Sequence, residues 1–172
     1  MKLGSKLGAD VPFFILDESF AIGMGIGDRL KTVKTRLGIW HLLVNPGFHV
    51  PTKGIYQALD RARIKGVKRL TTGPSGDKIH SLLEEAVDFG TIEPMLHNDL
   101  ESVVVAKKAV LGVMIRRLAA LLGKKAIVSG SGPSLFCLYR TRKEAQKARA
   151  VFLDSLPARK RVKWQVFVAR TC

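Results

Sequence analysis

The feature that most constrains the fold is a long amphipathic segment between Asn98 and Gly123. Its apolar residues recur at steps of three and four, which places them along one face of an α-helix. Asn98 with Glu101 has the spacing of a capping box, and Gly123 fits a left-handed C-cap. The segment predicts one long helix whose Lys and Arg pairs mostly face away from the core. The apolar positions are Leu100, Val103, Val104, Leu111, Met114, Ile115, Leu118 and Leu122.

Short strands and further helices flank this helix. Turn residues such as Asn45-Pro46-Gly47 end the apolar runs, as expected for strand ends. Thr52 and Thr141 are suitable N-caps for the helices that follow them. The arrangement predicts an α+β fold with helices covering one face of a sheet. The predicted strands are 40–44, 125–128, 134–139 and 162–169, and the predicted helices start near 52, 78 and 142.

Residues 1–40 are expected to be extended, with an apolar strand at Phe13–Leu16. Asp10 stands directly before this apolar run. A carboxylate there is placed to act as a base or an orienting group for a hydroxyl. An Asp turn before Pro12 explains the same residues equally simply. The composition by itself favours the turn.

Two glycine clusters have the composition of phosphate-binding loops. Gly23-x-Gly25-x-Gly27 does not fit the dinucleotide fingerprint, because the third glycine would fall at Asp28. Glycines in a twisted or bulged strand are the simpler explanation there. The cluster Ser129–Gly132 lies between two predicted strands, where consecutive N–H groups form anion-binding nests. A tight hairpin explains that cluster about as well.

The charge suggests nucleic acid, an anionic membrane surface or a phosphorylated ligand, but the basic residues are not distributed as in a nucleic-acid-binding module. The chain of 172 residues has 29 Lys and Arg against 14 Asp and Glu, a net charge of +15. Aromatic residues make up only 7% of the chain, and none lies inside the basic groups at 61–69, 140–149 and 159–163. We therefore expect these groups to be solvated helix faces and not a nucleic-acid-binding surface. Lys107-Lys108 and Arg116-Arg117 interrupt the most apolar stretch, which excludes a membrane span there. The two cysteines have no metal-ligand spacing.

Five segments occur in a set order along the chain: 7–14, 25–28, 44–47 with 50–52, 98–101 and 129–134. In that order they resemble the 4-diphosphocytidyl-2-C-methyl-D-erythritol kinases, a family of the GHMP kinase superfamily. The resemblance covers nearly the whole sequence. It implies a GHMP-kinase C-terminal domain at 38–172, with an antiparallel sheet covered by helices, after a remnant of the N-terminal nucleotide-binding domain at 1–37.

The resemblance implies ATP-dependent phosphorylation of a hydroxyl of the cytidylyl sugar alcohol, in the non-mevalonate route to isoprenoid precursors. Asp10 matches the catalytic aspartate, which orients or deprotonates the hydroxyl. ATP is the expected co-substrate, with Mg²⁺, and the expected location is the cytoplasm. No structural or catalytic metal site is expected in the chain itself. The implied cytidine-pocket residues are Pro51, Thr52 and Tyr56, and those of the phosphate-proximal glycine motif are Gly130, Ser131 and Gly132.

The family's catalytic lysine and Gly/Ser-rich ATP loop have no match in this sequence. Lys2 and Lys6 do not fit the motif of that lysine. Phosphoryl transfer depends on the donors that such a loop supplies, so we expect a truncated kinase with weak or no activity alone. Its expected protein partners are a missing N-terminal half or a second copy. The alternative is a non-catalytic binding module on the kinase scaffold, which engages a protein or an anionic polymer.

Overall fold

The computed structural model describes residues 4–8, 10–16, 18–24, 29–33, 37–64, 89–157 and 163–171. Within this part of the chain, the strands form two separate antiparallel sheets. A two-stranded sheet pairs β1 (Ala21–Met24) with β2 (Arg29–Thr32). A four-stranded sheet has the order β4-β5-β3-β6. Its strands are β3 (Trp40–Asn45), β4 (Ile127–Val128), β5 (Leu135–Tyr139) and β6 (Gln165–Arg170).

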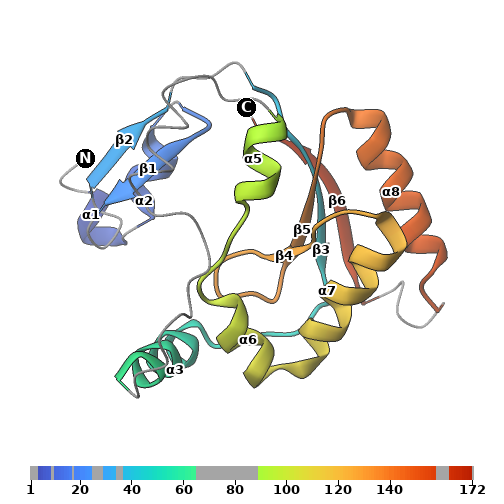
Figure 1. Cartoon of the computed structure of the whole chain (residues 1–172). Helices are drawn as coiled ribbons and strands as arrows, with labels where there is room; N and C mark the ends of the chain where they lie inside the picture. The colour runs from blue at the N-terminus through green and yellow to red at the C-terminus, as the bar shows by residue number, and fades with distance from the viewer. Residues whose placement is uncertain are drawn as a thin grey trace.

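The helices α6 (Glu101–Lys107), α7 (Ala109–Leu122) and α8 (Arg142–Asp154) cover one face of the larger sheet (Figure 1). Side chains alternate across a strand, so Leu42 and Val44 of β3 point into this layer and are fully buried. They share one core with residues of all three helices. Leu111, Leu118 and Phe152 are its large buried members on α7 and α8.

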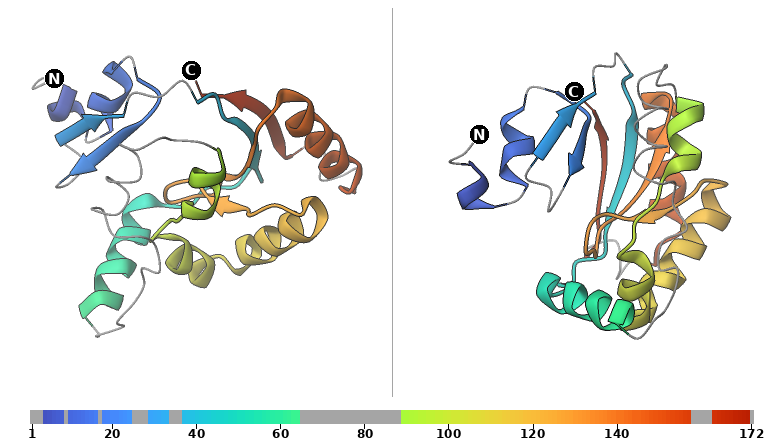
Figure 2. Two further views of the ribbon diagram at one scale, coloured as in Figure 1. Left: turned by 45° about the horizontal axis from the view of Figure 1, so that its top comes forward. Right: turned by 60° about the vertical axis from the view of Figure 1, so that its left-hand side comes forward.

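The opposite face of the sheet is partly covered by α5 (Phe89–Met95). Phe89 packs with Ile39 and Leu138 in a second, smaller cluster. α3 (Thr52–Ile64) lies beyond one end of the sheet, near α6 (Figure 2). The two-stranded sheet lies with α1 (Gly4–Leu7) and α2 (Val11–Ile15) toward the other end (Figure 2).

The prediction of one helix between Asn98 and Gly123 is wrong, because the chain bends at Lys108. That residue has φ −137° and ψ 73°, outside the helical region. Gly112 allows the bend: a Cβ there would lie 2.7 Å from Cγ1 of Val105, so α6 packs closely on α7. The predicted C-cap is confirmed, since Gly123 has φ 61° and its N–H donates to the Ala119 carbonyl at 2.9 Å.

The predicted caps have mixed outcomes. Thr141 caps α8 and forms a full capping box with Glu144. Asn98 and Glu101 do not form one, because α6 begins at Glu101 and has no side-chain cap. Thr52 is not an N-cap either, because it is the first residue of α3 and its hydroxyl bonds elsewhere.

The expectation of an extended N-terminal segment is also wrong in part. Val11–Ile15 is a short helix, α2, and its proline lies in the first turn, where the missing N–H of proline costs nothing. Asp10 therefore precedes a helix, not a strand. Gly23 lies in β1 opposite Leu30, as the strand explanation of this glycine cluster requires. Its companions at 25–28, and the predicted loop and helix between 66 and 88, lie outside the described residues.

Cys137 is a buried thiol in the four-stranded sheet. It is 1% exposed in β5, and burial raises the pKa of its thiol to about 12. In the described part of the chain, no helix has the length and apolar character needed to cross a membrane.

Candidate functional site

The glycine cluster forms the tight loop between β4 and β5. The Ser129 N–H donates to the Ser134 carbonyl at 2.8 Å, and the Gly132 N–H donates to the Ser129 carbonyl at 2.9 Å. Gly130 and Gly132 have φ of 53° and 77°, left-handed conformations that side chains with a Cβ adopt at a cost. The peptide bond between Gly132 and Pro133 is cis. We call residues 129–134 the glycine loop.

The two left-handed glycines face different surroundings. A Cβ at Gly132 would lie 3.3 Å from Cγ1 of Val128 and 3.5 Å from Cγ1 of Val104, so Gly132 packs on the core below α6. A Cβ at Gly130 would meet no atom within 4 Å. The loop is thus anchored to the core at Gly132 and open at Gly130, where a ligand can approach its backbone.

The last residue of β3 and the first residue of α3 are each hydrogen-bonded to the glycine loop. Thr52 Oγ1 and Ser131 Oγ are 2.8 Å apart, a hydrogen bond between residues 79 positions apart in sequence. Asn45 Nδ2 donates to Ser134 Oγ at 3.2 Å, and Asn45 Oδ1 accepts from the Gly47 N–H at 2.8 Å. The structure therefore brings together the segment predicted to bind cytidine and the segment predicted to lie beside the phosphates.

Tyr56 lies one helical turn after Thr52, so both side chains leave the same side of α3. Tyr56 is 53% exposed, and its ring is accessible for stacking. Pro51 is exposed too, but it lines a separate pocket with Lys107 and Lys108 at the bend between α6 and α7. Of the three predicted cytidine-pocket residues, Thr52 is the one bonded to the glycine loop.

Sequence reasoning missed the role of Asn98 and Glu101, which bind the base of the glycine loop. Asn98 Nδ2 donates to the carbonyls of Val128 at 2.7 Å and Gly130 at 2.8 Å. Its Oδ1 accepts from the Leu100 N–H at 3.0 Å. Glu101 Oε2 accepts from the Val128 N–H at 2.9 Å. The sequence did contain a signal: both residues lie in the segment 98–101, and their spacing predicted a helix cap.

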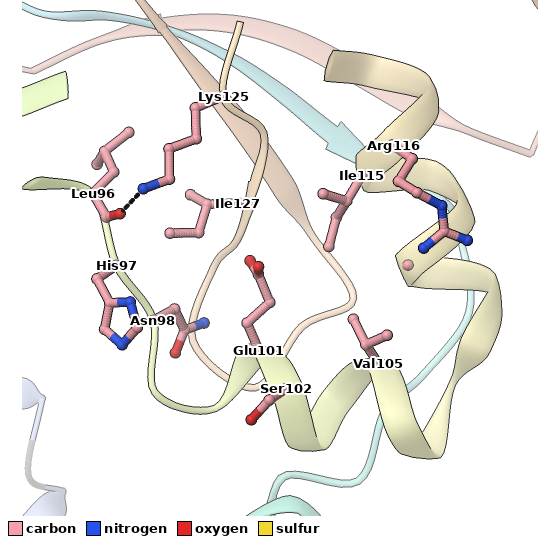
Figure 3. Close-up of a pocket in the computed structure, with 11 residues that line it drawn as sticks. Leu96, His97, Asn98, Glu101, Ser102, Val105, Ile115, Arg116, Lys125 and Ile127 are labelled. Atoms are coloured by element: carbon pink, nitrogen blue, oxygen red, sulfur yellow. Dashed lines mark hydrogen bonds between the residues drawn. The ribbon is translucent and has the colours of Figure 1, made fainter. Parts of the chain in front are cut away.

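A pocket of about 560 Å³ opens behind the glycine loop, between α6, α7 and β4 (Figure 3). The carboxylate of Glu101 points into it, and Asn98 lies at its edge (Figure 3). Leu96, Ile115 and Ile127 give the pocket an apolar wall. Lys125 Nζ donates to the Leu96 carbonyl, and this bond closes one side of the pocket.

Asp10 is not close to the glycine loop. It is exposed at the start of α2, and its side chain makes no capping bond to that helix. Phe13 and Phe14, next in α2, line a pocket with Arg170. Arg170 pairs with Trp40, at the end of β3 opposite Asn45 and the glycine loop. A strand of this length spans roughly 20 Å, so Asp10 lies near the far end of the sheet.

The described residues include no group of three or more His, Cys, Asp or Glu side chains that could hold a metal ion. His97 Nε2 and Asp99 Oδ1 are 2.7 Å apart, a pair beside the pocket of Figure 3. Glu101, the acidic residue nearest the glycine loop in this pocket, is already bonded to the backbone of Val128. This part of the chain therefore offers the loop backbone and hydroxyls, not a cluster of acids, as ligand-binding groups.

A family model defines the class of this fold. Residues 80–157 match the model described as GHMP kinases C terminal. Residues 80–157 are therefore a GHMP kinase C-terminal domain, and they include strands β4 and β5 of the four-stranded sheet and the helices α6 to α8 that pack on it. The predicted fold class is confirmed.

Over nearly its whole length the chain is similar to 4-diphosphocytidyl-2-C-methyl-D-erythritol kinases. It is 39% identical to the enzyme of Pelobacter propionicus, over 90% of this chain and 50% of the relative. It is 34% identical to that of Syntrophus aciditrophicus, over 99% and 55%. A solved structure of 4-(cytidine 5'-diphospho)-2C-methyl-D-erythritol kinase has a TM-score of 0.70 and 27% identity, over 96% of this chain and 54% of that one. The chain spans about half the length of these relatives.

Proposed function

We propose that this chain is part of a kinase that transfers the γ-phosphoryl group of ATP to a hydroxyl of 4-diphosphocytidyl-2-C-methyl-D-erythritol. The observation that carries the proposal is the hydrogen bond between Thr52 and Ser131, 2.8 Å long. It joins the segment expected to hold the cytidine to the loop expected to lie beside the phosphates. The names of the relatives supply the substrate and the reaction.

The reaction needs few protein groups. The substrate hydroxyl oxygen forms a bond to the γ-phosphorus, the bond from that phosphorus to the bridging oxygen breaks, and ADP leaves. The hydroxyl proton passes to the Asp10 carboxylate, which we propose as the base. Catalysis of this kind depends on positioning and on stabilisation of charge, with little covalent chemistry by the protein.

The glycine loop suits the charge-stabilising part of this task. Gly130 has a left-handed backbone, is exposed, and has open space where a side chain would stand. Successive N–H groups in such a loop form a concave site for an anion. Hydroxyls of Ser131 and Thr52 border the same loop. We propose that phosphate oxygens lie against this backbone, with Tyr56 stacking on the cytosine ring from the first turns of α3.

Mg²⁺ accompanies ATP in phosphoryl transfer and is held by one or two carboxylates together with the phosphates. When bound it neutralises charge on the β- and γ-phosphates. Asp10 is far from the glycine loop along the sheet, and Glu101 is bonded to Val128. Neither Asp10 nor Glu101 therefore fits a Mg²⁺ site at the loop, and we assign the ion to neither.

We propose a boundary between two structural parts at residues 37 and 38. The part before it holds the two-stranded sheet, and the part after it holds the four-stranded sheet; among the described residues, no strand belongs to both sheets. We further propose that residues 1–37 complete a nucleotide-binding domain whose ATP loop and lysine come from a sequence like the first half of the relatives. Turnover by this chain alone would then be weak or absent.

The test is reconstitution. The 172-residue chain is assayed for ADP release with ATP and the cytidylyl substrate, alone and together with the N-terminal half of the Pelobacter propionicus relative. We expect turnover from the pair, and at least a hundredfold loss in the pair carrying Asp10→Asn, as for removal of a general base. A folded, associated pair without turnover would refute the kinase proposal. Rapid turnover by the chain alone would refute the need for a second half.

A second candidate function is a binding module for an anionic polymer, favoured by the surface around Trp40. The guanidinium groups of Arg142 and Arg170 lie 5.8 Å and 6.0 Å from its ring centroid. Arg149 borders the same shallow pocket. A cationic surface with an aromatic ring is the arrangement that single-stranded nucleic acids engage. Retention on single-stranded RNA that falls steeply with salt would support this function, and no retention at 50 mM salt would exclude it.

A further inference from the structure

We propose that Asn98 and Glu101 are positioning residues that hold the glycine loop in the geometry that binds phosphate. They reach its base from the side of α6 and bind the backbone of Val128 and Gly130. The proposal rests on the proposed function only in naming phosphate as the ligand of the loop. The positioning itself is a property of the loop backbone and is measured separately below.

Asn98 uses its amide fully. Both donor positions of Nδ2 are occupied, by the carbonyl of Val128 at 2.7 Å and the carbonyl of Gly130 at 2.8 Å. Oδ1 accepts from the Leu100 N–H, just before α6 begins. Because these bonds use opposite ends of one planar amide, they fix its orientation. One side chain thereby joins the start of α6 to Val128, just before the glycine loop, and to Gly130 within it.

Glu101 completes the bonding of Val128. This valine is 1% exposed and lies in β4, an edge strand of the sheet. Edge strands leave backbone groups unpaired on their outer side, and buried unpaired groups are costly. Here the N–H of Val128 donates to Glu101 and its carbonyl accepts from Asn98. Two side chains of the α6 region thus take the place of a further strand, at the residue where the glycine loop begins.

Packing connects the same helix to the far side of the loop. Val104 of α6 is fully buried, and its Cγ1 would lie 3.5 Å from a Cβ at Gly132. The loop is therefore held at Val128, at Gly130 and at Gly132, all by residues at or near α6. The N–H of Ser129 is bonded to Ser134 and that of Gly132 to Ser129, so the N–H groups of Gly130 and Ser131 are the ones we propose for a ligand. A loop held at three points keeps its N–H donors in one orientation before a ligand binds. Electrostatic catalysis requires hydrogen-bond donors that are preorganised in this way.

Substitutions can remove one function of each side chain at a time. Asn98→Asp keeps an acceptor for the Leu100 N–H, removes both donors, and sets a carboxylate against two carbonyl oxygens. Glu101→Ala removes the acceptor for the Val128 N–H, and Glu101→Gln restores one. Glu144→Ala is a matched control, because Glu144 Oε2 accepts a backbone N–H from Thr141 at 3.0 Å at the start of α8.

The experiment uses the 172-residue chain and two measurements. Amide hydrogen exchange at Gly132, whose N–H is bonded inside the loop, reports loop geometry. Titration with inorganic tripolyphosphate reports ligand binding. We expect Asn98→Asp and Glu101→Ala to speed Gly132 exchange at least tenfold and to weaken tripolyphosphate binding at least tenfold. Glu101→Gln and Glu144→Ala are expected to stay within twofold of the parent chain in both.

Unchanged Gly132 exchange in Asn98→Asp, or equal effects of Glu101→Gln and Glu101→Ala, would overturn the positioning role. If Asn98→Asp does not fold, the two Glu101 variants decide the question. Faster exchange together with unchanged tripolyphosphate binding would also overturn it, because the loop geometry would then not matter to the ligand. A parent chain that binds no tripolyphosphate would refute the phosphate-binding role of the loop, while Gly132 exchange still decides whether Asn98 and Glu101 hold it.

Discussion

Alanine substitutions at Gly130 and Gly132 separate backbone strain from crowding in the glycine loop. Both residues are left-handed, with φ of 53° and 77°. A left-handed alanine costs about 1 kcal/mol relative to glycine, and that cost applies to both. Alanine also lowers the entropy of the unfolded chain, by an amount that is the same at either position and cancels in the comparison. The remaining difference comes from the surroundings of the new methyl group.

Those surroundings differ sharply. The methyl group at Gly130 would meet no atom within 4 Å. The one at Gly132 would lie 3.3 Å from Val128 and 3.5 Å from Val104, on side chains that are themselves buried. Added methyl groups in a packed core cost about 1–3 kcal/mol. We therefore expect Gly132→Ala to lower the free energy of unfolding by about 1–3 kcal/mol more than Gly130→Ala does.

Urea denaturation of the two variants and the parent chain measures this difference, provided that all three share one m-value. Gly123→Ala is the control outside the loop, because Gly123 has φ 61° and open space at its Cβ position. It is expected to behave like Gly130→Ala. Equal losses at Gly130 and Gly132 would show that Gly132 does not pack on the core as described, and would remove the anchoring of the loop at that point.

Three further outcomes are expected. A double-mutant cycle of Thr52→Val and Ser131→Ala gives a coupling energy of about 0.5 kcal/mol by denaturation, because their hydrogen bond is solvent-exposed; additive effects would contradict the bond. Burial raises the Cys137 pKa from 9.0 to about 12. The folded chain thus favours the neutral thiol, and the free energy of unfolding falls as pH rises from 9 toward 12. Between pH 9 and 10 the parent should lose about 1 kcal/mol more than Cys137→Ala; parallel pH profiles would contradict this. Phe152→Ala removes a buried ring stacked on Trp164 at 5.6 Å and should cost about 3–5 kcal/mol; a loss under 1 kcal/mol by urea denaturation would contradict the packing.

Elements with strong local signals were predictable from the sequence. β3 follows from an apolar run that ends at Asn45-Pro46-Gly47, and Gly47 does adopt the left-handed turn conformation, with φ 74°. α8 follows from its cap at Thr141 and its proline at 157. In each case the residues that define the ends lie within a few positions of the element. The local sequence is then sufficient to predict where the element begins and ends.

The bend at Lys108 was not predictable in this way. The apolar residues Val104 and Leu111 are seven positions apart, a spacing that a straight helix also satisfies. The bend brings α6 close to α7 across Gly112, and this is a tertiary contact that the spacing of apolar residues does not reveal. Lys107 and Lys108, which leave a gap in the apolar stripe, are the one local sign of it.

Asn98 and Glu101 failed as a capping box for a related reason. Their spacing is right, but carbonyl and N–H groups near residue 128 compete for the same side chains and are buried, so leaving them unpaired costs more than an uncapped helix end. The competing groups lie about thirty positions away in the chain. A spacing rule identifies side chains suited to bind backbone groups, but the fold decides which backbone groups they bind.

Asp10 gives the last constraint on the proposed kinase. A catalytic base must come within hydrogen-bond reach of the substrate hydroxyl, about 3 Å, while the phosphate loop lies just beyond that hydroxyl. Asp10 instead lies near the Arg170 end of the sheet, and the glycine loop lies at the Asn45 end, on the order of 20 Å away. Asp10 and the loop cannot serve one substrate in this arrangement. The kinase proposal therefore requires the N-terminal part to move relative to the four-stranded sheet in the active assembly. The small contact of α2 with the sheet end, at Phe13, Phe14 and Arg170, is consistent with such a movement.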